Sequence, residues 1–331
     1  MNIRKEKEER EKVFLSEFAV KSSESRGRVV EEEPCKVRTC FERDRDRILH
    51  SKSFRRLKHK TQVFLSPLGD HYRTRLTHTL EVSQIARTLA VALNLNETLV
   101  EAIAYGHDLG HTPFGHAGEA VLNEVCPFEF KHNVHSLRVV EKLENQKGLN
   151  LTYEVRNGIV NHCTGYTPST LEGKIVLMSD KIAYINHDID DSIRAGVLNP
   201  SDLPSDCISI LGETTPKRIN TMIYDIIVNS KGKNDILKSK EIEEVTTKLR
   251  AFMFERVYTS KYAKEESKKA QDMLRLLYQY FVANPSKMPN EYQLKNDEDT
   301  IERVVCDYIA GMTDNYAVRT FENLFVPTSI R

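Results

Sequence analysis

The sequence predicts an all-α protein. Apolar residues recur at helical spacing along most of the chain, and alternating strand patterns are few. No internal repeat or low-complexity linker divides the 331 residues. The simplest interpretation is a single compact domain over residues 1–331, with a core over 73–190 and a helical C-terminal subdomain over 200–331.

The expected helices follow in order from residue 79. Residues 79–93 place apolar side chains near one helical face. Asn94, with Glu97 three residues later, resembles a capping box and predicts the start of a helix through residue 109. Further helices are expected over residues 135–144, 152–163, 172–196, 216–230, 240–260, 263–283 and 301–312. At most one small β-hairpin is expected, over residues 60–72, with a turn at 67–70.

Composition excludes several classes of protein. The 48 basic and 48 acidic side chains cancel, which argues against a nucleic-acid binder that works through overall charge. The first residues are charged and lack the apolar core of a signal peptide, and no apolar run approaches the ~20 residues of a membrane span. The six cysteines are too sparse for a disulfide framework. We therefore expect a cytoplasmic protein with reduced cysteines and no membrane partner.

The histidines are unevenly distributed. All 11 lie between His50 and His187, so the last 144 residues contain none. The densest stretch, YGHDLGHTPFGHAGE over residues 105–119, holds three of them together with an aspartate and a glutamate. The ionic chemistry of the protein is therefore expected in the first two thirds of the chain.

Four residues are candidate metal ligands: His78, His107, Asp108 and Asp180. Imidazole and carboxylate ligands suit a divalent first-row metal, and two of each leave coordination positions open. Adjacent helical residues diverge by about 100°, so His107 and Asp108 can reach one ion only at a helix end or distorted turn. The glycines near this pair favour such a distortion. Taken singly, a histidine on a helix is more often structural, and an adjacent His–Asp pair is often a helix cap.

Six segments together resemble a known family. They are RDRDRILHSKSFRRLKHKTQVF (43–64), RTRLTHTLEV (73–82), HDLGHTPFGHAGE (107–119), FKHNVHSLRVVE (130–141), SDKIAYINHDIDD (179–191) and VCDYIAGMTDNYA (305–317). They are similar to the signature blocks of the deoxynucleoside triphosphate triphosphohydrolases, the dGTPase-like family of the HD phosphohydrolase superfamily. The resemblance spans roughly residues 22–325 and implies an HD-domain helical fold with its catalytic core over 73–190.

The resemblance implies metal-dependent hydrolysis of a dNTP to a deoxynucleoside and intact triphosphate, by attack at the α-phosphorus. It implies a divalent ion (Mn, Mg, Fe, Co or Zn) on the four ligands named above. It also implies a homo-oligomer, with a nucleotide activator as a further expectation. The implied residues are His116 near the scissile 5′-oxygen, Glu119 as its acidic partner, His111 and His132 as further active-site histidines, Arg75 and Lys181 at the phosphates, and Gln62, Tyr184 and Asp188 around the deoxyribose.

Physical chemistry supports these roles. A triphosphate carries close to four negative charges and needs cations around it. A 5′-alkoxide is a poor leaving group, so an imidazolium at His116 would serve as general acid, and Glu119 lies at the i+3 spacing that permits contact. Asp180, Tyr184 and Asp188 fall on one stripe of a helix. Two alternatives remain: a phosphohydrolase acting on another nucleotide phosphoester, and a non-catalytic nucleotide sensor or nucleic-acid-binding protein.

Overall fold

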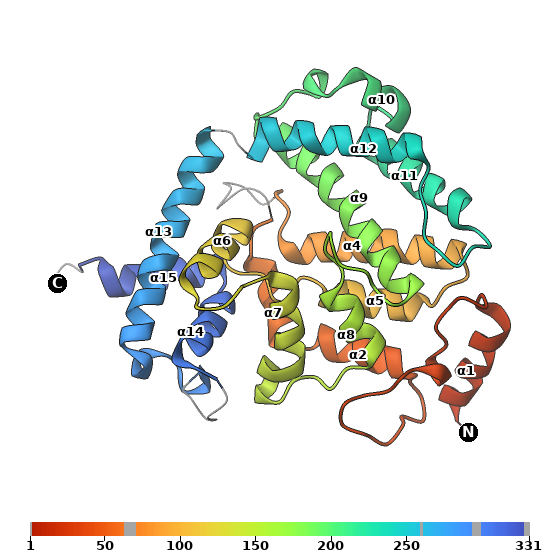
Figure 1. Cartoon of the computed structure of the whole chain (residues 1–331), viewed down its shortest axis with the longest axis horizontal. Helices are drawn as coiled ribbons and strands as arrows, with labels where there is room; N and C mark the ends of the chain where they lie inside the picture. The colour runs from red at the N-terminus through yellow and green to blue at the C-terminus, as the bar shows by residue number, and fades with distance from the viewer. Residues whose placement is uncertain (1, 63–70, 259–260, 293–298, 328–331) are drawn as a thin grey trace.

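A computed structural model describes residues 2–62, 71–258, 261–292 and 299–327. Within these ranges the chain forms fifteen α-helices and no β-strand, with isolated antiparallel bridges at Arg28–Thr152 and Thr61–Thr74 (Figure 1). The all-α prediction is therefore confirmed. The turn predicted at residues 67–70 lies outside the described residues, and the Thr61–Thr74 bridge joins the two chain segments on either side of it.

The α-helices run in chain order as α1 (Ile3–Phe14), α2 (Cys40–Leu49), α3 (Lys52–Arg56), α4 (Arg75–Ala92), α5 (Glu97–Gly106), α6 (Gly115–Val125), α7 (His132–Arg138), α8 (Tyr153–Val160), α9 (Leu171–Arg194), α10 (Ser205–Leu211), α11 (Thr215–Ser230), α12 (Lys240–Met253), α13 (Lys261–Ala283), α14 (Ile301–Ala310) and α15 (Asp314–Phe325). Each helix expected from the sequence corresponds to one of these. Single π-helical segments, Val139–Leu143 and Phe254–Tyr258, extend α7 and α12. No helix in the described part of the chain is both long and apolar enough to cross a membrane.

The start of α5 differs from the prediction. Its N-cap is Asn96, whose side chain accepts a hydrogen bond from the Leu99 amide at 3.1 Å. Asn94 instead ends α4: it has a left-handed φ of 53°, and the amides of Asn94 and Leu95 donate to the carbonyls of Val91 and Ala90. This pair of bonds is a Schellman motif. The capping-box prediction at Asn94 was therefore wrong, because the residue closes the preceding helix.

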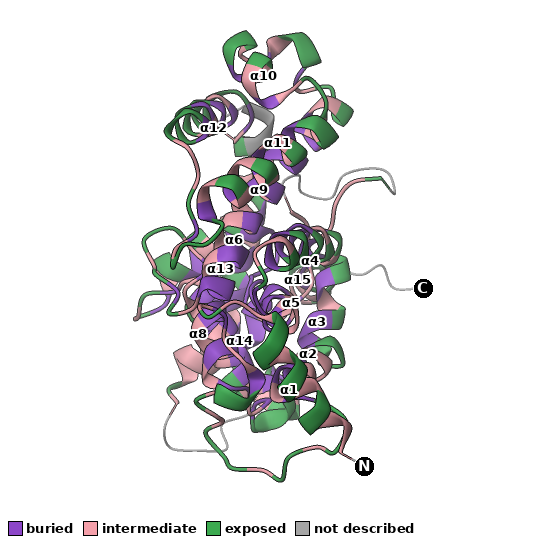
Figure 2. Cartoon of the chain, turned by 90° about the vertical axis from the view of Figure 1, so that its right-hand side faces the viewer, coloured by how far each residue is buried: buried purple, intermediate pink, exposed green. Residues whose placement is uncertain are grey.

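The buried apolar residues form two clusters. The larger cluster contains residues of α2, α4, α5, α8 and α9 together with α10, α11 and α12. The smaller cluster joins α6 to α13, α14 and α15, at the left of Figure 1. Figure 2 shows the buried positions gathered where the helices face one another. The helices after residue 200 thus divide between the two clusters, and the predicted subdomain boundary stays a prediction.

Three helices of the larger cluster position the candidate site. α9, the 24-residue helix, packs against both α4 and α5. The C-terminal end of α5 at Gly106 leads into a turn over residues 107–110. This arrangement brings the C-terminal end of α5, a point within α4 and the middle of α9 close together.

Candidate metal centre and active site

The four predicted metal ligands lie together. His78 projects from α4, His107 and Asp108 follow the end of α5, and Asp180 belongs to α9. Nε2 of His78 is 3.0 Å from Oδ1 of Asp180, and Nε2 of His107 is 3.4 Å from Oδ1 of Asp108 and 3.9 Å from Oδ1 of Asp180. Ligand atoms about 2.0–2.2 Å from one ion are about 3–3.5 Å apart, so most of these separations suit a shared cation.

The orientation of His107 fits a metal ligand. Its Nδ1–H donates to the carbonyl of Ala104 at 2.6 Å, which leaves a lone pair on Nε2. That nitrogen is buried and has no hydrogen-bond partner among the described residues. A buried polar atom without a partner is costly, and a cation beside it would remove the cost. The donor set of two imidazoles and two carboxylates therefore fits the divalent ion that the sequence implies.

Arg75 lies beside this centre. Its Nη1 donates to Oδ2 of Asp108 at 2.9 Å, and both side chains are buried. Burial raises the pKa of Asp108, but the neighbouring His107 and His111 rings and the Arg75 guanidinium outweigh this effect and hold that pKa well below its usual range. Asp108 is therefore ionised, as a metal ligand must be. The prediction placed Arg75 at the substrate phosphates; the structure shows it bound to a predicted ligand.

His111 connects the metal centre to a second group of side chains, which consists of His116, Glu119 and His132. Nε2 of His111 is 3.2 Å from Oδ1 of Asp108, and its ring stacks on His132 with centroids 3.9 Å apart. Oε1 of Glu119 accepts from the backbone amide and from Nδ1 of His132, at 2.8 and 2.9 Å. Oε2 of the same carboxylate is 3.4 Å from Nδ1 of His116. The Glu119 carboxylate thus contacts two histidines. Its contact with His116 was predicted from the sequence, but its contact with His132 was not.

The charges of this second group follow from its contacts. Burial raises the pKa of Glu119, but its hydrogen bonds to His116 and His132 outweigh it and hold that pKa far below the usual range. Burial lowers the pKa of His132, but the hydrogen bonds to Cys163 and Glu119 outweigh the effect of burial and raise this pKa to about 10. The His132 imidazole is therefore a cation at neutral pH in the absence of a metal. The His116 ring is open to solvent, with 66% of its side chain exposed.

The turn after α5 packs directly on α7. The amide of Gly110 donates to Oγ of Ser136 at 2.8 Å, and that hydroxyl donates to the carbonyl of His107 at 2.7 Å. A Cβ at Gly110 would lie 2.1 Å from the Ser136 nitrogen and 2.5 Å from the His132 carbonyl oxygen. Only glycine permits this approach, which places His132 of α7 beside the His–Asp turn.

Gly110→Ala is expected to lower the free energy of unfolding by about 3 kcal/mol, because backbone atoms cannot yield to the added methyl group. Urea denaturation followed by circular dichroism measures the change. Gly232→Ala is the matched control, since a Cβ there meets nothing within 4 Å and the cost is only that of φ at +73°, about 1 kcal/mol. Equal losses for the two variants would contradict the close packing described here.

The predicted stripe on α9 is present. Asp180, Tyr184 and Asp188 follow one another along the helix, and the Asp188 carboxylate accepts a hydrogen bond from the hydroxyl of Tyr258. Burial raises the pKa of Asp188 to about 7. The rings of Tyr184 and Tyr258 lie 6.0 Å apart. Tyr258, from the π-helical segment after α12, thus contacts two predicted site residues and was not itself predicted from the sequence.

Lys181 and Gln62 lie at the edges of the site. Lys181 is half-buried on α9, and burial together with the charge of Arg250 lowers its pKa. Oε1 of Gln62 is buried with no hydrogen-bond partner among the described residues. The Gln62 carbonyl lies near Gly115, and a Cβ on that glycine would come 2.9 Å from Nη2 of Arg75. The structure therefore gathers Gln62 and Arg75 around the N-terminus of α6.

The loop before α6 is held by the C-terminal helices. Oδ1 of Asp314, the first residue of α15, accepts from the Phe114 amide at 3.0 Å. Its Oδ2 accepts from the amide and hydroxyl of Thr61 at 2.9 and 2.7 Å. The buried Nζ of Lys60 donates to the carbonyls of His111 and Ala310. Residues far apart in the sequence thus fix the loop that carries His111 and leads into α6, where His116 lies.

Two more neighbours of His132 were not among the predicted site residues. His162 and Cys163 lie just beyond the C-cap of α8, and both contact Nε2 of His132, at 3.3 and 3.2 Å. The confinement of histidines to the first two thirds of the chain already included His162. The sequence around Cys163 did not indicate a functional role, because one cysteine next to one histidine is also common in proteins that have no metal site.

Two family models match this chain, over the candidate site and over the C-terminal helices. The HD domain family matches residues 75–185, and the phosphohydrolase-associated domain matches residues 236–323. The HD match begins with α4 and ends within α9, so it includes all four predicted metal ligands. A crystal structure of a hypothetical protein from Aquifex aeolicus aligns with a TM-score of 0.49 at 20% identity, over 85% of this chain and 71% of that one.

Similar proteins extend over nearly the whole chain. A deoxyguanosinetriphosphate triphosphohydrolase-like protein from Caldanaerobacter subterraneus is 60% identical over 99% of this chain and 97% of its own length. Proteins of the same name from Clostridium perfringens and Geobacter sulfurreducens are 52% and 40% identical, over 99% and 96% of this chain and 98% and 96% of their own lengths. On this similarity and the HD match, the chain belongs to the dGTP triphosphohydrolase-like family of HD phosphohydrolases.

Proposed function

We propose that this protein hydrolyses deoxynucleoside triphosphates to deoxynucleoside and inorganic triphosphate, with the help of a divalent ion. One observation carries the proposal: the His116–Glu119–His132 group adjoins the four candidate metal ligands through His111, which contacts Asp108 and stacks on His132. A proton donor beside a metal centre is what cleavage of an alkoxide ester requires. The names of the relatives refer to dGTP, which supports this substrate class.

His78, His107, Asp108 and Asp180 would hold the ion, which is Mn, Mg, Fe, Co or Zn. When bound, a divalent ion there would draw charge from phosphate oxygens and lower the pKa of a bound water towards ~7. Arg75 keeps Asp108 ionised and oriented through its 2.9 Å hydrogen bond. The protein thereby prepares a ligand set of fixed charge before substrate arrives.

His116 is the proposed general acid. As the bond between the α-phosphorus and the 5′-oxygen breaks, its imidazolium would pass a proton to that oxygen, and the deoxynucleoside would leave as an alcohol. Glu119 orients the ring through the contact at Nδ1. Since the His116 side chain is largely exposed, it can take a new proton from solvent after each turnover.

The remaining predicted residues surround the substrate. Lys181 and the cationic His132 would balance the charge of the triphosphate, while Arg75 would share its guanidinium between Asp108 and a phosphate oxygen. Gln62, Tyr184 and Asp188 would contact the deoxyribose, and the Tyr258 hydroxyl holds the Asp188 carboxylate in place. The homo-oligomer and the nucleotide activator stay predictions.

The product of hydrolysis tests the proposal. Purified protein is incubated with each dNTP and with Mg²⁺, Mn²⁺, Fe²⁺ or Co²⁺ in water enriched in ¹⁸O, and the products are separated. We expect inorganic triphosphate that carries the label, because attack at the α-phosphorus places the new oxygen on the phosphate product. Pyrophosphate or monophosphate as the product, or label in the deoxynucleoside, would contradict the proposed reaction.

A further inference from the structure

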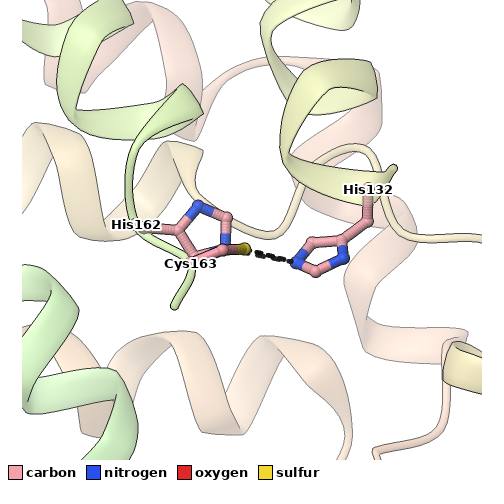
Figure 3. Close-up of side chains that lie close together, drawn as sticks. All are labelled: His132, His162 and Cys163. Atoms are coloured by element: carbon pink, nitrogen blue, oxygen red, sulfur yellow. Dashed lines mark hydrogen bonds between the residues drawn. The ribbon is translucent and has the colours of Figure 1, made fainter. Parts of the chain in front are cut away.

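Three side chains outside the predicted metal quartet converge on one point. His132 extends from α7, and His162 and Cys163 follow α8 (Figure 3). Nε2 of His132 is 3.3 Å from Nε2 of His162 and 3.2 Å from Sγ of Cys163, and Sγ is 3.4 Å from Nε2 of His162. The side-chain Nδ2 of Asn133 donates to the carbonyl of Val160 at 2.6 Å and ties α7 to the end of α8. The three atoms are therefore held close by the fold itself.

These separations match the edges of a tetrahedral metal site. Bonds of about 2.0–2.1 Å from zinc to nitrogen and about 2.3 Å to sulfur give edges of about 3.3–3.4 Å between nitrogens and about 3.5–3.6 Å between nitrogen and sulfur. The observed triangle has edges of 3.2–3.4 Å. A cation can thus bind all three atoms with only small movement of the sulfur.

The two histidines are also oriented as metal ligands. Nδ1–H of His162 donates to the Ile159 carbonyl at 2.6 Å, and Nδ1–H of His132 donates to Oε1 of Glu119 at 2.9 Å. Both donors are thereby used away from the triangle, as outer partners do in metal sites. The two Nε2 atoms then face each other across 3.3 Å, so the position between them holds either the proton of the cationic His132 or a metal ion in its place. This observation is independent of the distances.

The chemistry of this triangle differs from that of the His–Asp quartet. A thiolate with two imidazoles selects soft or borderline ions, whereas the carboxylates of the quartet also suit Mg²⁺ and Mn²⁺. The two groups are neighbours, since the rings of His107 and His162 lie 5.0 Å apart, but they share no ligand. The sulfur of Cys163 therefore gives this triangle a spectroscopic signature that the quartet cannot produce.

We propose that Nε2 of His132, Nε2 of His162 and Sγ of Cys163 form a second metal site for zinc-class divalent ions, with its fourth position open to water or an anion. Binding releases the Cys163 thiol proton, and the proton on Nε2 of His132, to solvent, and no electron is transferred. The ion replaces the proton on Nε2 of His132, while Nδ1–H keeps its hydrogen bond to Glu119. With Nε2 bound to the ion, His132 can no longer donate a hydrogen bond from this nitrogen to a phosphate oxygen, so occupancy inhibits the enzyme, a consequence that rests on the proposed function.

Cobalt(II) tests the site without any assay of activity. The full chain is titrated with Co²⁺, and the near-ultraviolet charge-transfer band of a cobalt–thiolate bond is followed. We expect the band in the wild type and in Asp180→Ala, and its loss in Cys163→Ser. Cys35→Ser is the matched control, since it removes a partly exposed thiol in the N-terminal segment, and it should keep the band. Thermal melting of each variant shows that it is folded.

Three outcomes would overturn the second site. The band could persist in Cys163→Ser, it could be lost in Cys35→Ser, or it could be absent from the wild type at saturating cobalt. Zinc affinity gives a separate measure. Loss of a ligand should weaken binding by more than the roughly 10–100-fold cost of losing an outer partner. Less than a tenfold change in the affinity of the thiolate site in Cys163→Ser would also count against the assignment.

The inhibition is measured as dNTP hydrolysis against zinc concentration, each variant being scaled to its own rate without zinc. We expect inhibition of the wild type that is weakened at least tenfold in Cys163→Ser. Equal inhibition of the two proteins would overturn the inhibitory consequence. A cobalt–thiolate band in a protein that hydrolyses no dNTP would overturn the proposed function and leave the second site standing.

Discussion

Asp180→Ala is expected to remove most of the bound divalent ion from the quartet and to lower kcat by at least about 10³-fold. Asp180 holds His78 at 3.0 Å and lies 3.9 Å from Nε2 of His107, so its loss opens the site on the side of α9. Metal analysis after gel filtration and steady-state hydrolysis of dGTP measure the two effects. The fold should persist, because the remaining contacts of α9 are unchanged.

Asp190→Ala is the matched control for this experiment. Asp190 lies on the same helix, but its carboxylate binds Arg73 at 3.2 Å and Thr215 at 3.1 Å and reaches none of the quartet. This variant should retain metal and activity within about a few-fold. Full metal occupancy in Asp180→Ala would remove this residue from the proposed ligands.

His116→Ala is expected to lower kcat by about 10²–10⁴-fold while leaving the metal content unchanged. The reason is that the ring contacts Glu119 and none of the four candidate ligands. A substrate whose 5′-oxygen is replaced by sulfur separates this role from a binding role, since a thiolate leaves without a proton. On that substrate the variant should approach the wild-type rate.

An equal loss on both substrates would mean that His116 does not supply the proton, and loss of metal would make it a ligand. His50→Ala is a suitable control, because His50 is an exposed histidine at the C-terminus of α2. It should leave both rates and the metal content unchanged.

Much of the fold and the quartet could be predicted because both follow from local sequence. Helical periodicity identified α4, α9 and α11 to α14 within a few residues, and the spacing of His78, His107 and Asp180 placed each ligand on a separate element. Asn94 shows the limit of local interpretation. The same asparagine fits the start of one helix and the end of another, and only the packing of Leu95 decides between them.

The rest of the site depends on contacts between distant segments. Tyr258 reaches Asp188 across 70 residues, and Cys163 reaches His132 across 31. No periodicity or motif in the sequence specifies such pairs. Arg75 was predicted from the family pattern as a phosphate contact, but its bond to Asp108 depends on how α4 meets the turn after α5.

The anchoring of the loop before α6 by Asp314 has a consequence for how mutations are interpreted. Asp314 is 200 residues from Phe114 and 253 from Thr61, and it lies outside the matched HD region, yet it binds the backbone of the loop before α6 and that of the separate segment before α4. A substitution there acts on the geometry of His116 without touching substrate. In genetic data, loss of activity from a change near the C-terminus would therefore point to the active site itself, and the distance along the chain would be no guide to distance from the chemistry.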